Sequence, residues 1–213
     1  MNKPPILILS WPSASGKTVI NQKIEEIHCA PTGKIITCTT RPPRAWEVQA
    51  KDYYFYTKEE FEEMIQRGEC IEWAKYPKPK NATDENWNFY GSTWQELERI
   101  TSQKLVPIYI IEVQWAKTIT EILQEKYRVI SLFLLPPSEE ELERRLRGRG
   151  TEPEDVIQKR LAAAKDEIAL KDNYDVRLVN HDILETATTI GRLVGDLLAN
   201  APDSYIKKYD MVA

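Results

Sequence analysis

The 213-residue sequence lacks the features that mark several special classes of protein. Its three cysteines, Cys29, Cys38 and Cys70, have no metal-type spacing, and their odd number fits a reducing compartment. No apolar run approaches the roughly 20 residues that span a membrane, and the opening Met-Asn-Lys-Pro-Pro leads into an expected strand rather than a signal peptide. The net charge of −4 gives no sign of general affinity for nucleic acid. We therefore expect a cytoplasmic protein that binds neither membranes nor nucleic acid.

The chain also lacks internal repeats and low-complexity tracts, and its 42% hydrophobic content is that of an ordinary globular protein. It is long enough for one large domain with inserted lobes. Apolar runs at 6–9, 106–111 and 129–135 alternate with helical segments, which predicts an α/β fold: a parallel sheet with helices on both faces. Two polar segments, 37–93 and 137–171, are expected to lie outside this sheet.

The stretch from Ile6 to Thr18 carries the first functional signal. Four apolar residues run into Ser-Ala-Ser-Gly-Lys-Thr, and a helix is expected from Thr18 onward. This is the layout of a phosphate-binding loop, in which backbone N–H groups surround phosphates, Lys17 reaches the terminal phosphates and Thr18 binds Mg²⁺. The alternative is a surface turn with a chance Gly-Lys-Thr. The first position of the motif, normally glycine, is Trp11.

A second signal is the pair Arg41 and Arg44, separated by two prolines that hold the loop extended. From such a segment both guanidinium groups can converge on one anion, and their forked donors suit phosphate oxygens. A solvated basic loop is the alternative. Farther along, a strand is expected over 71–74, and Glu72 within it either faces solvent or accepts N–H donors from a base.

The remaining local signals give expected elements. Strands are expected over 35–37 and, rich in aromatics, over 52–56. A capping box at Thr57 opens a helix over 58–67, and another at Ser138 opens a helix over 139–147. A strand is expected over 176–179, and the tail from Ala201 is expected to be frayed.

Four segments in combination resemble the guanylate kinase family, and the resemblance covers about residues 4–199. They are Ser10-Trp-Pro-Ser-Ala-Ser-Gly-Lys-Thr18; Thr39-Thr-Arg-Pro-Pro-Arg-Ala-Trp-Glu47 with Asp52-Tyr53; Glu72-Trp73-Ala74 with Asn88-Phe-Tyr-Gly-Ser-Thr93; and Leu135-Pro-Pro-Ser-Glu-Glu-Glu-Leu-Glu-Arg-Arg-Leu-Arg-Gly-Arg-Gly-Thr151. The resemblance implies a three-layer P-loop α/β fold with a central parallel sheet, an inserted GMP-binding lobe and a helical lid. The implied parts are a core of 1–36, 94–136 and 172–213, a lobe of 37–93 and a lid of 137–171.

The resemblance also implies an activity, the Mg²⁺-dependent transfer of the γ-phosphoryl group of ATP to GMP or dGMP. ATP and GMP would be the partners, and the assembly a monomer or homodimer. By position, the ATP site would comprise Ser13, Ala14, Ser15, Gly16, Lys17, Thr18 and Asn180, with Thr18 on the magnesium ion. The GMP site would comprise Thr37, Arg41, Arg44, Tyr53, Glu72, Tyr90, Ser92 and Glu112. The catalytic groups would be Lys17, Arg145, Arg149 and Arg160.

Two other interpretations stay open. Related domains in scaffold proteins have lost catalysis and bind phosphorylated peptides through the arginines of the GMP lobe. Those domains typically lack the loop lysine and the lid arginines, which this chain retains at Lys17 and Arg145. A kinase for another nucleoside monophosphate is the second alternative. Glu72 argues against it, because a carboxylate accepts two N–H donors from guanine and adenine has no such edge.

The chain departs from the family pattern at Trp11, Trp46, Trp87 and Trp115, which all stand where the family has glycine. Ala14 and Ala50 are milder exchanges of the same kind. A glycine position can demand positive φ, where a bulky residue costs roughly 1–2 kcal/mol. We therefore formed the hypothesis that a stop-type codon, decoded as glycine in the source lineage, has been translated as tryptophan.

Overall fold

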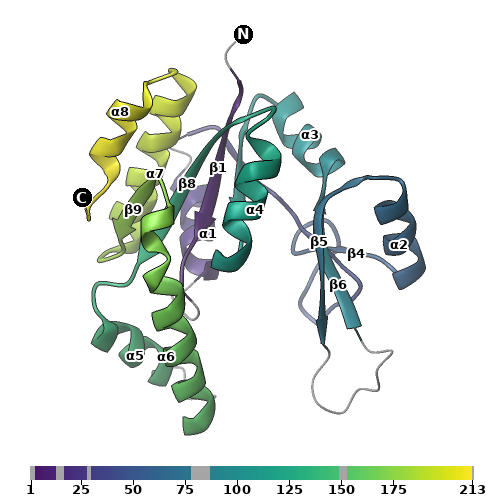
Figure 1. The fold of residues 1–213 in the computed structure, drawn as a ribbon, viewed down its shortest axis with the longest axis horizontal. Helices are drawn as coiled ribbons and strands as arrows, with labels where there is room; N and C mark the ends of the chain where they lie inside the picture. Colours follow the sequence, from purple (N-terminus) through teal and green to yellow (C-terminus); the bar gives the residue numbers. More distant parts are fainter. Residues whose placement is uncertain (1–2, 13–16, 28–29, 78–86, 149–152, 213) are drawn as a thin grey trace. The chain divides into compact units, whose positions relative to one another are not determined.

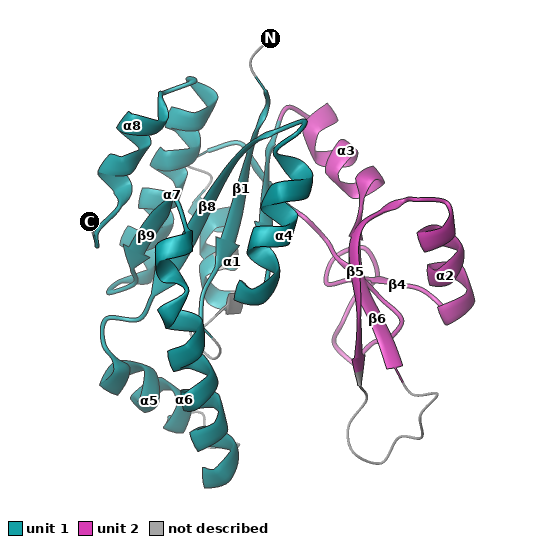
Figure 2. Cartoon of the chain, in the orientation of Figure 1, with its two compact units in different colours: residues 1–34, 105–213 teal, residues 35–104 magenta. Residues whose placement is uncertain are grey.

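The chain folds into two compact units (Figures 1 and 2). The computed structural model describes residues 3–12, 17–27, 30–77, 87–148 and 153–212. Unit 1 comprises residues 1–34 and 105–213, and unit 2 comprises residues 35–104. The lobe suggested by the sequence ends at residue 93, whereas unit 2 continues through helix α3 (Trp94–Ser102), which contacts strand β6 (Trp87–Thr93) of the same unit.

Unit 1 is built on a parallel sheet whose strand order, within the described residues, is β2-β7-β1-β8-β9. The central strand β1 reads Pro-Ile-Leu-Ile-Leu-Ser, and the side chains of its four apolar residues are 0% exposed. The prediction of a parallel sheet with a strand buried on both faces is confirmed. The strands are β1 (Pro5–Ser10), β2 (Thr32–Lys34), β7 (Val106–Ile110), β8 (Arg128–Leu135) and β9 (Val176–Val179).

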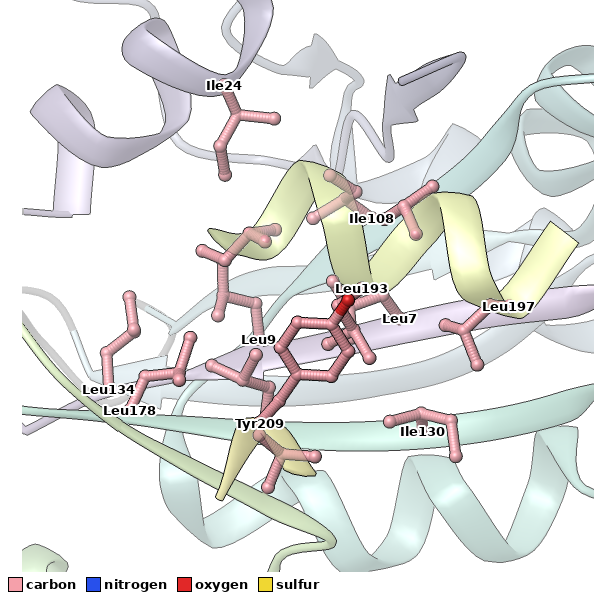
Figure 3. Close-up of a cluster of buried hydrophobic side chains, with 14 of the residues drawn as sticks. Leu7, Leu9, Ile24, Ile108, Ile130, Leu134, Leu178, Leu193, Leu197 and Tyr209 are labelled. Atoms are coloured by element: carbon pink, nitrogen blue, oxygen red, sulfur yellow. The ribbon is translucent and has the colours of Figure 1, made fainter. Parts of the chain in front are cut away.

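Helices cover both faces of this sheet, which gives the predicted three layers (Figure 1). On one face α1 (Lys17–Ile27) and α7 (Ile183–Leu198) contact each other and pack on Leu7 and Leu9. On the other face α4 (Val113–Leu123) contacts β1 and β8. Figure 3 shows the leucine-rich cluster on the first face, where side chains from several strands meet those of α7.

The C-terminal segment is folded, so the expectation of a frayed tail from Ala201 was wrong. It forms α8 (Asp203–Ile206) and a short 3₁₀ helix, η2 (Lys207–Tyr209). Ile206 is 2% exposed and Tyr209 is 9% exposed, and the Tyr209 ring lies among the core leucines in Figure 3. The Met211 N–H donates to the Arg177 carbonyl at 2.8 Å, so this segment also covers part of the free edge of β9.

Two further helices of unit 1, α5 (Glu139–Arg147) and α6 (Glu154–Ala169), pack against each other. Their contact is apolar and includes Leu142, Leu146 and Ile157, all of which are buried. The Ser138 hydroxyl accepts the Glu141 N–H, so the predicted start of the first helix is confirmed. These two helices make up most of the segment that the sequence suggested as a lid.

Unit 2 contains a small mixed sheet with the order β4-β3-β6-β5 among the described residues. Its other strands are β3 (Cys38–Thr39), β4 (Tyr54–Phe55) and β5 (Cys70–Pro77). Helix α2 (Lys58–Gln66) packs on one face, where the rings of Phe61 and Phe89 stack with centroids 5.0 Å apart. The predicted capping box at Thr57 is present.

Of the strands in this region, one was predicted wrongly, one was predicted too long and one was missed. The segment 35–37 is not a strand, because its backbone bonds within unit 2: the Ile36 N–H donates to Glu96 and the Thr37 carbonyl accepts the Tyr54 N–H. The aromatic strand expected over 52–56 is reduced to β4. Strand β6 was not predicted at all, because its Asn, Gly, Ser and Thr residues mask the usual alternation of apolar and polar side chains.

Candidate functional site

The three residues suggested to read guanine lie in one row across the sheet of unit 2. Glu72 of β5 is directly opposite Ser92 of β6, and Cys38 of β3 is opposite Gly91. Thr37 precedes Cys38, so continuing the antiparallel register places it opposite Ser92. Residues directly opposite each other share a face of the sheet. The structure therefore brings a carboxylate and two hydroxyls together although 55 residues separate Thr37 from Ser92 in the sequence.

Gly91 allows this row to form. A Cβ atom added to it would lie 2.5 Å from the Glu72 carbonyl oxygen and 3.1 Å from the Trp73 Cβ. Any side chain at this position would therefore push β5 away from β6 beside Glu72 and Ser92. In the sequence this glycine stands out only as part of a motif, and its role could not be predicted from it.

The suggested phosphate clamp also gathers in unit 2. Tyr90 is two residues from Ser92 on β6 and therefore faces the same side of the sheet. Its ring is 6.2 Å from that of Tyr53, and the Arg41 guanidinium lies over the Tyr53 ring at 5.5 Å. Burial raises the pKa of the Tyr53 hydroxyl, which keeps it protonated and able to donate a hydrogen bond. Arg44, by contrast, has a side chain that is 61% exposed.

Glu47 holds the two arginines of the clamp together. Its carboxylate accepts two hydrogen bonds from Arg41, at 2.9 and 2.8 Å, and one from the Arg44 backbone N–H at 2.7 Å. The Glu47 side chain is only 7% exposed. The Arg41 guanidinium holds the pKa of Glu47 below its usual range, so this carboxylate is ionised at neutral pH. Sequence reasoning included Glu47 in a motif without giving it a function.

Glu96 is a second buried carboxylate that the sequence analysis missed. It is 2% exposed, and it accepts hydrogen bonds from the Ile36 N–H at 3.0 Å and the Tyr54 hydroxyl at 2.9 Å. Arg99 donates to both of its oxygens, at 2.7 and 2.8 Å. This network ties α3 to the segment that leads into Thr37. The sequence signal was a Glu at the third position of a helix that begins after Thr93, which looks like an ordinary capping residue.

In unit 1 the expected phosphate-binding loop leads into α1, as its strand–loop–helix layout requires. Lys17 and Thr18 are the first two residues of this helix, and the structure describes their backbone but not their side chains. Ser13, Ala14, Ser15, Gly16 and Arg149 lie outside the described residues altogether.

Trp11, Arg145 and Asn180 line one small cavity of unit 1. Its volume is about 10 Å³, room for no more than about one water molecule. Trp11 is 3% exposed and belongs to the main apolar core, and its indole N–H has no partner among the described residues. Asn180 is 6% exposed and accepts a hydrogen bond from the Thr186 hydroxyl at 3.1 Å. Trp11 thus lines the same cavity as Arg145, a suggested catalytic residue, and Asn180, a suggested residue of the ATP site.

The four tryptophans at family glycine positions do not have the backbone conformation that the sequence argument assumed. Among the described non-glycine residues, positive φ occurs at Ala50, Lys104 and Asn200 and at none of these tryptophans. The expectation of backbone strain there was wrong. Ala50, with φ of 60°, is the exchanged position that does adopt the left-handed conformation.

The suggested lid arginines lie on α5 and α6. The Arg145 Nε donates to Glu141 at 2.7 Å, and Arg144 donates to the same carboxylate. Hydrogen bonds from these two guanidinium groups lower the pKa of Glu141 to about 2. Arg160 is half-buried on α6.

Glu112, the N-cap residue of α4, follows β7. Its carboxylate is exposed and accepts a hydrogen bond from the Gln114 amide at 3.1 Å. Strand β7 is the parallel neighbour of β1, and Ile110 is opposite Leu9. Glu112 and the loop after β1 therefore lie at the same carboxyl edge of the sheet, where parallel α/β folds bind ligands.

Two features are absent from the residues that the structure describes. No helix among them is long and apolar enough to cross a bilayer. No group of three or more His, Cys, Asp or Glu side chains among them is arranged to hold a metal ion.

Known proteins are similar to this chain along almost its whole length. The sequence profile described as guanylate kinase matches residues 3–197. A guanylate kinase of Prochlorococcus marinus (strain MIT 9312) is 38% identical over 197 residues, which cover 91% of this chain and 98% of that protein. One of Anaplasma phagocytophilum (strain HZ) is 38% identical over 189 residues, or 89% of this chain and 85% of that protein.

A solved structure agrees with the sequence relatives. The crystal structure of guanylate kinase from Anaplasma phagocytophilum has a TM-score of 0.65 and 34% identity, and the match covers 92% of this chain and 87% of that one. The sequence profile, the sequence relatives and the fold give one answer: this chain belongs to the guanylate kinase family.

Proposed function

We propose that the protein is a cytoplasmic guanylate kinase, which transfers the γ-phosphoryl group of ATP to GMP or dGMP. The observation that carries this proposal is the polar face of unit 2. There Glu72, Ser92 and Thr37 form one row, and Arg41 and Tyr53 lie beside it. A carboxylate that can accept two N–H donors selects guanine, and a cation among tyrosine hydroxyls suits a phosphate.

The protein's own part in the reaction is to position two anionic substrates and to neutralise charge. Arg41, Arg44, Tyr53 and Tyr90 would bind the GMP phosphate. Lys17 and the backbone of the loop before α1 would bind the ATP phosphates at a helix N-terminus. Arg145, Arg149 and Arg160 would neutralise the charge that spreads over the transferring group, an effect that can be worth about 10³-fold or more in rate.

The residues present fit a magnesium ion. Mg²⁺ prefers oxygen ligands and is commonly bound through one or two protein groups together with substrate phosphates. The exposed Glu112 carboxylate is such an oxygen donor, at the same sheet edge as the loop that ends at Thr18. When bound, the ion would neutralise phosphate charge and orient the donor.

A phosphopeptide-binding module without catalysis is the second candidate. The observation that favours it is the buried Trp11 side chain, which lines, together with Arg145 and Asn180, a cavity of only about 10 Å³. A purine base does not fit in that space. If Asn180 lies near the adenine, as the resemblance suggests, the chain as it stands would bind ATP weakly.

A coupled assay of ADP formation with GMP, AMP, UMP or CMP as acceptor tests these candidates. We expect turnover with GMP and none above background with the other three. Substituting Glu72→Gln should reduce the preference for GMP by roughly 10-fold or more, because one acceptor of the guanine edge becomes a donor. Phosphopeptide binding without turnover of any acceptor would favour the binding module instead.

A further inference from the structure

The contact between Glu47 and Arg41 uses one particular edge of the arginine. A guanidinium group has five N–H donors on a planar fork. Glu47 Oε2 accepts from Nη1 at 2.9 Å and Glu47 Oε1 accepts from Nη2 at 2.8 Å, so the carboxylate occupies the terminal edge. The second Nη1 donor points to the Pro42 carbonyl oxygen at 2.8 Å.

Glu47 and the Pro42 carbonyl leave two donors of Arg41, the Nε–H and the second Nη2–H. They lie side by side on the other edge of the guanidinium, and such a pair matches two oxygens of a phosphate. The Tyr90 side chain, which interacts with Arg41 and helps to raise its pKa, provides a second group for the same anion. The rings of Tyr53 and Phe55, at 5.5 and 6.0 Å, lie against the guanidinium and limit its rotation.

Glu47 also controls the neighbouring arginine through the backbone. Its Oε2 accepts the Arg44 N–H at 2.7 Å, and the Glu47 N–H donates to the Arg44 carbonyl at 3.0 Å. These bonds close the loop between the two arginines. The Arg44 side chain, which is 61% exposed and whose guanidinium lies 3.9 Å from Glu47 Oε1, therefore leaves a fixed backbone.

We propose that Glu47 is a positioning residue for acceptor binding: it holds the terminal edge of Arg41 so that the Nε–Nη2 edge faces the phosphate of the nucleoside monophosphate. This inference rests on the proposed function. It differs from a competing possibility, in which Glu47 occupies the place of the phosphate and must leave before GMP binds. The two make opposite predictions for a neutral side chain at position 47.

The test is calorimetric titration of the full-length chain with GMP and with guanosine, a probe that lacks the phosphate. The variant is Glu47→Gln, which keeps the shape of the side chain and removes its charge. The matched control is Asp52→Asn in the same loop, because the Asp52 carboxylate accepts the Val48 N–H at 2.8 Å and has no arginine partner in the described structure.

We expect Glu47→Gln to weaken GMP binding about 10-fold and to leave guanosine binding unchanged. Asp52→Asn should change neither by more than about twofold, as for most surface substitutions.

Each other outcome overturns the inference. Tighter GMP binding by Glu47→Gln would show that the carboxylate competes with the phosphate. Equal weakening of GMP and guanosine, or an equal effect of Asp52→Asn, would show that Glu47 only maintains the loop. Unchanged GMP binding by Glu47→Gln would overturn this inference alone, whereas no GMP binding by the unsubstituted chain would overturn the proposed function as well.

A double substitution sharpens the result. In an Arg41→Lys background there is no planar fork for Glu47 to orient. We therefore expect Glu47→Gln to weaken GMP binding less than twofold in that background, since the two residues act as one unit. A full 10-fold effect there would contradict a role that acts through Arg41.

Discussion

The two units of the molecule hold their side chains in place by different means. Unit 1 has a sheet whose central strand is buried on both faces and a large apolar core. Unit 2 has a smaller apolar cluster, and two buried carboxylates, Glu47 and Glu96, tie its segments together. Apolar packing is non-directional, whereas hydrogen bonds fix the orientation of each partner. The polar unit is therefore suited to presenting ligand-binding groups, and its stability should depend more strongly on pH.

Three of the tryptophans at family glycine positions show a difference in burial between the units, while Trp115 in unit 1 is partly buried. Trp11 in unit 1 is 3% exposed, whereas Trp46 and Trp87 in unit 2 are 75% and 43% exposed. The same exchange should therefore have very different consequences in the two units.

The largest effect is expected from Trp11→Gly. Removing a buried indole should reduce the free energy of unfolding by about 3 kcal/mol or more, because the surrounding core cannot fully collapse. Trp46→Gly, the matched control, should change it by less than about 0.5 kcal/mol. Urea denaturation measures both. A small effect of Trp11→Gly would show that the indole is not packed in the core.

The same variant also tests how the gene is read. Trp11→Gly opens the space beside Arg145 and Asn180, so we expect ATP affinity to rise although stability falls. The variant with glycine at all four positions should then turn over GMP faster than the chain as it stands. Ordinary UGG codons at positions 11, 46, 87 and 115 would sink the idea that these tryptophans are misread glycines.

An intermediate effect is expected from Glu96→Gln in unit 2. The amide keeps one acceptor but loses the charge that faces Arg99, and we expect a loss of about 2 kcal/mol. Burial favours a higher pKa for Glu96, but hydrogen bonds from Arg99, Ile36 and Tyr54 outweigh it and hold the pKa below its usual value.

The sign of the pH effect follows from that shift. A carboxylate with a lowered pKa in the folded state stabilises the protein above its unfolded pKa of about 4.3, and this contribution is lost as pH falls through the lower folded value. Glu96→Gln should therefore flatten the decrease in stability with acid, whereas Trp11→Gly should not. An unchanged acid slope in Glu96→Gln would contradict the network described for unit 2.

The smallest effect concerns Ala50, whose φ of 60° favours glycine. Ala50→Gly should raise the free energy of unfolding by about 1 kcal/mol, because it relieves the left-handed strain of a residue with a Cβ. The control is Ala163→Gly, an exposed position within α6, where the same exchange should lower it by about 1 kcal/mol. Thermal unfolding of both variants gives the sign, and a loss of stability in both would refute the strain at Ala50.

Local sequence was sufficient for most elements of unit 1. The strands β1, β8 and β9 follow from apolar runs, and α1 and α5 follow from their positions after a loop motif and a capping serine. These signals are strong because a strand inside a parallel sheet is covered on both faces and is therefore apolar along its length. The docked C-terminal segment was missed, because two buried residues among polar neighbours give no periodicity to detect.

The polar site needed the tertiary structure. Sequence motifs named Glu72, Thr37, Ser92 and Arg41, but no local pattern predicted that β6 would place the first three in one row. The sequence patterns also did not show that the lack of a side chain at Gly91 leaves room for the Glu72 carbonyl group. They did not show that the side chains of Glu96 and Glu47 are buried. Apolar periodicity reports only which face of an element is covered, and it carries no information on the partner of a carboxylate. The sequence by itself determined the parallel sheet and named the candidate site residues, whereas only the tertiary structure decided how the charges of unit 2 are oriented, because hydrogen-bond partners are chosen by the register of distant strands.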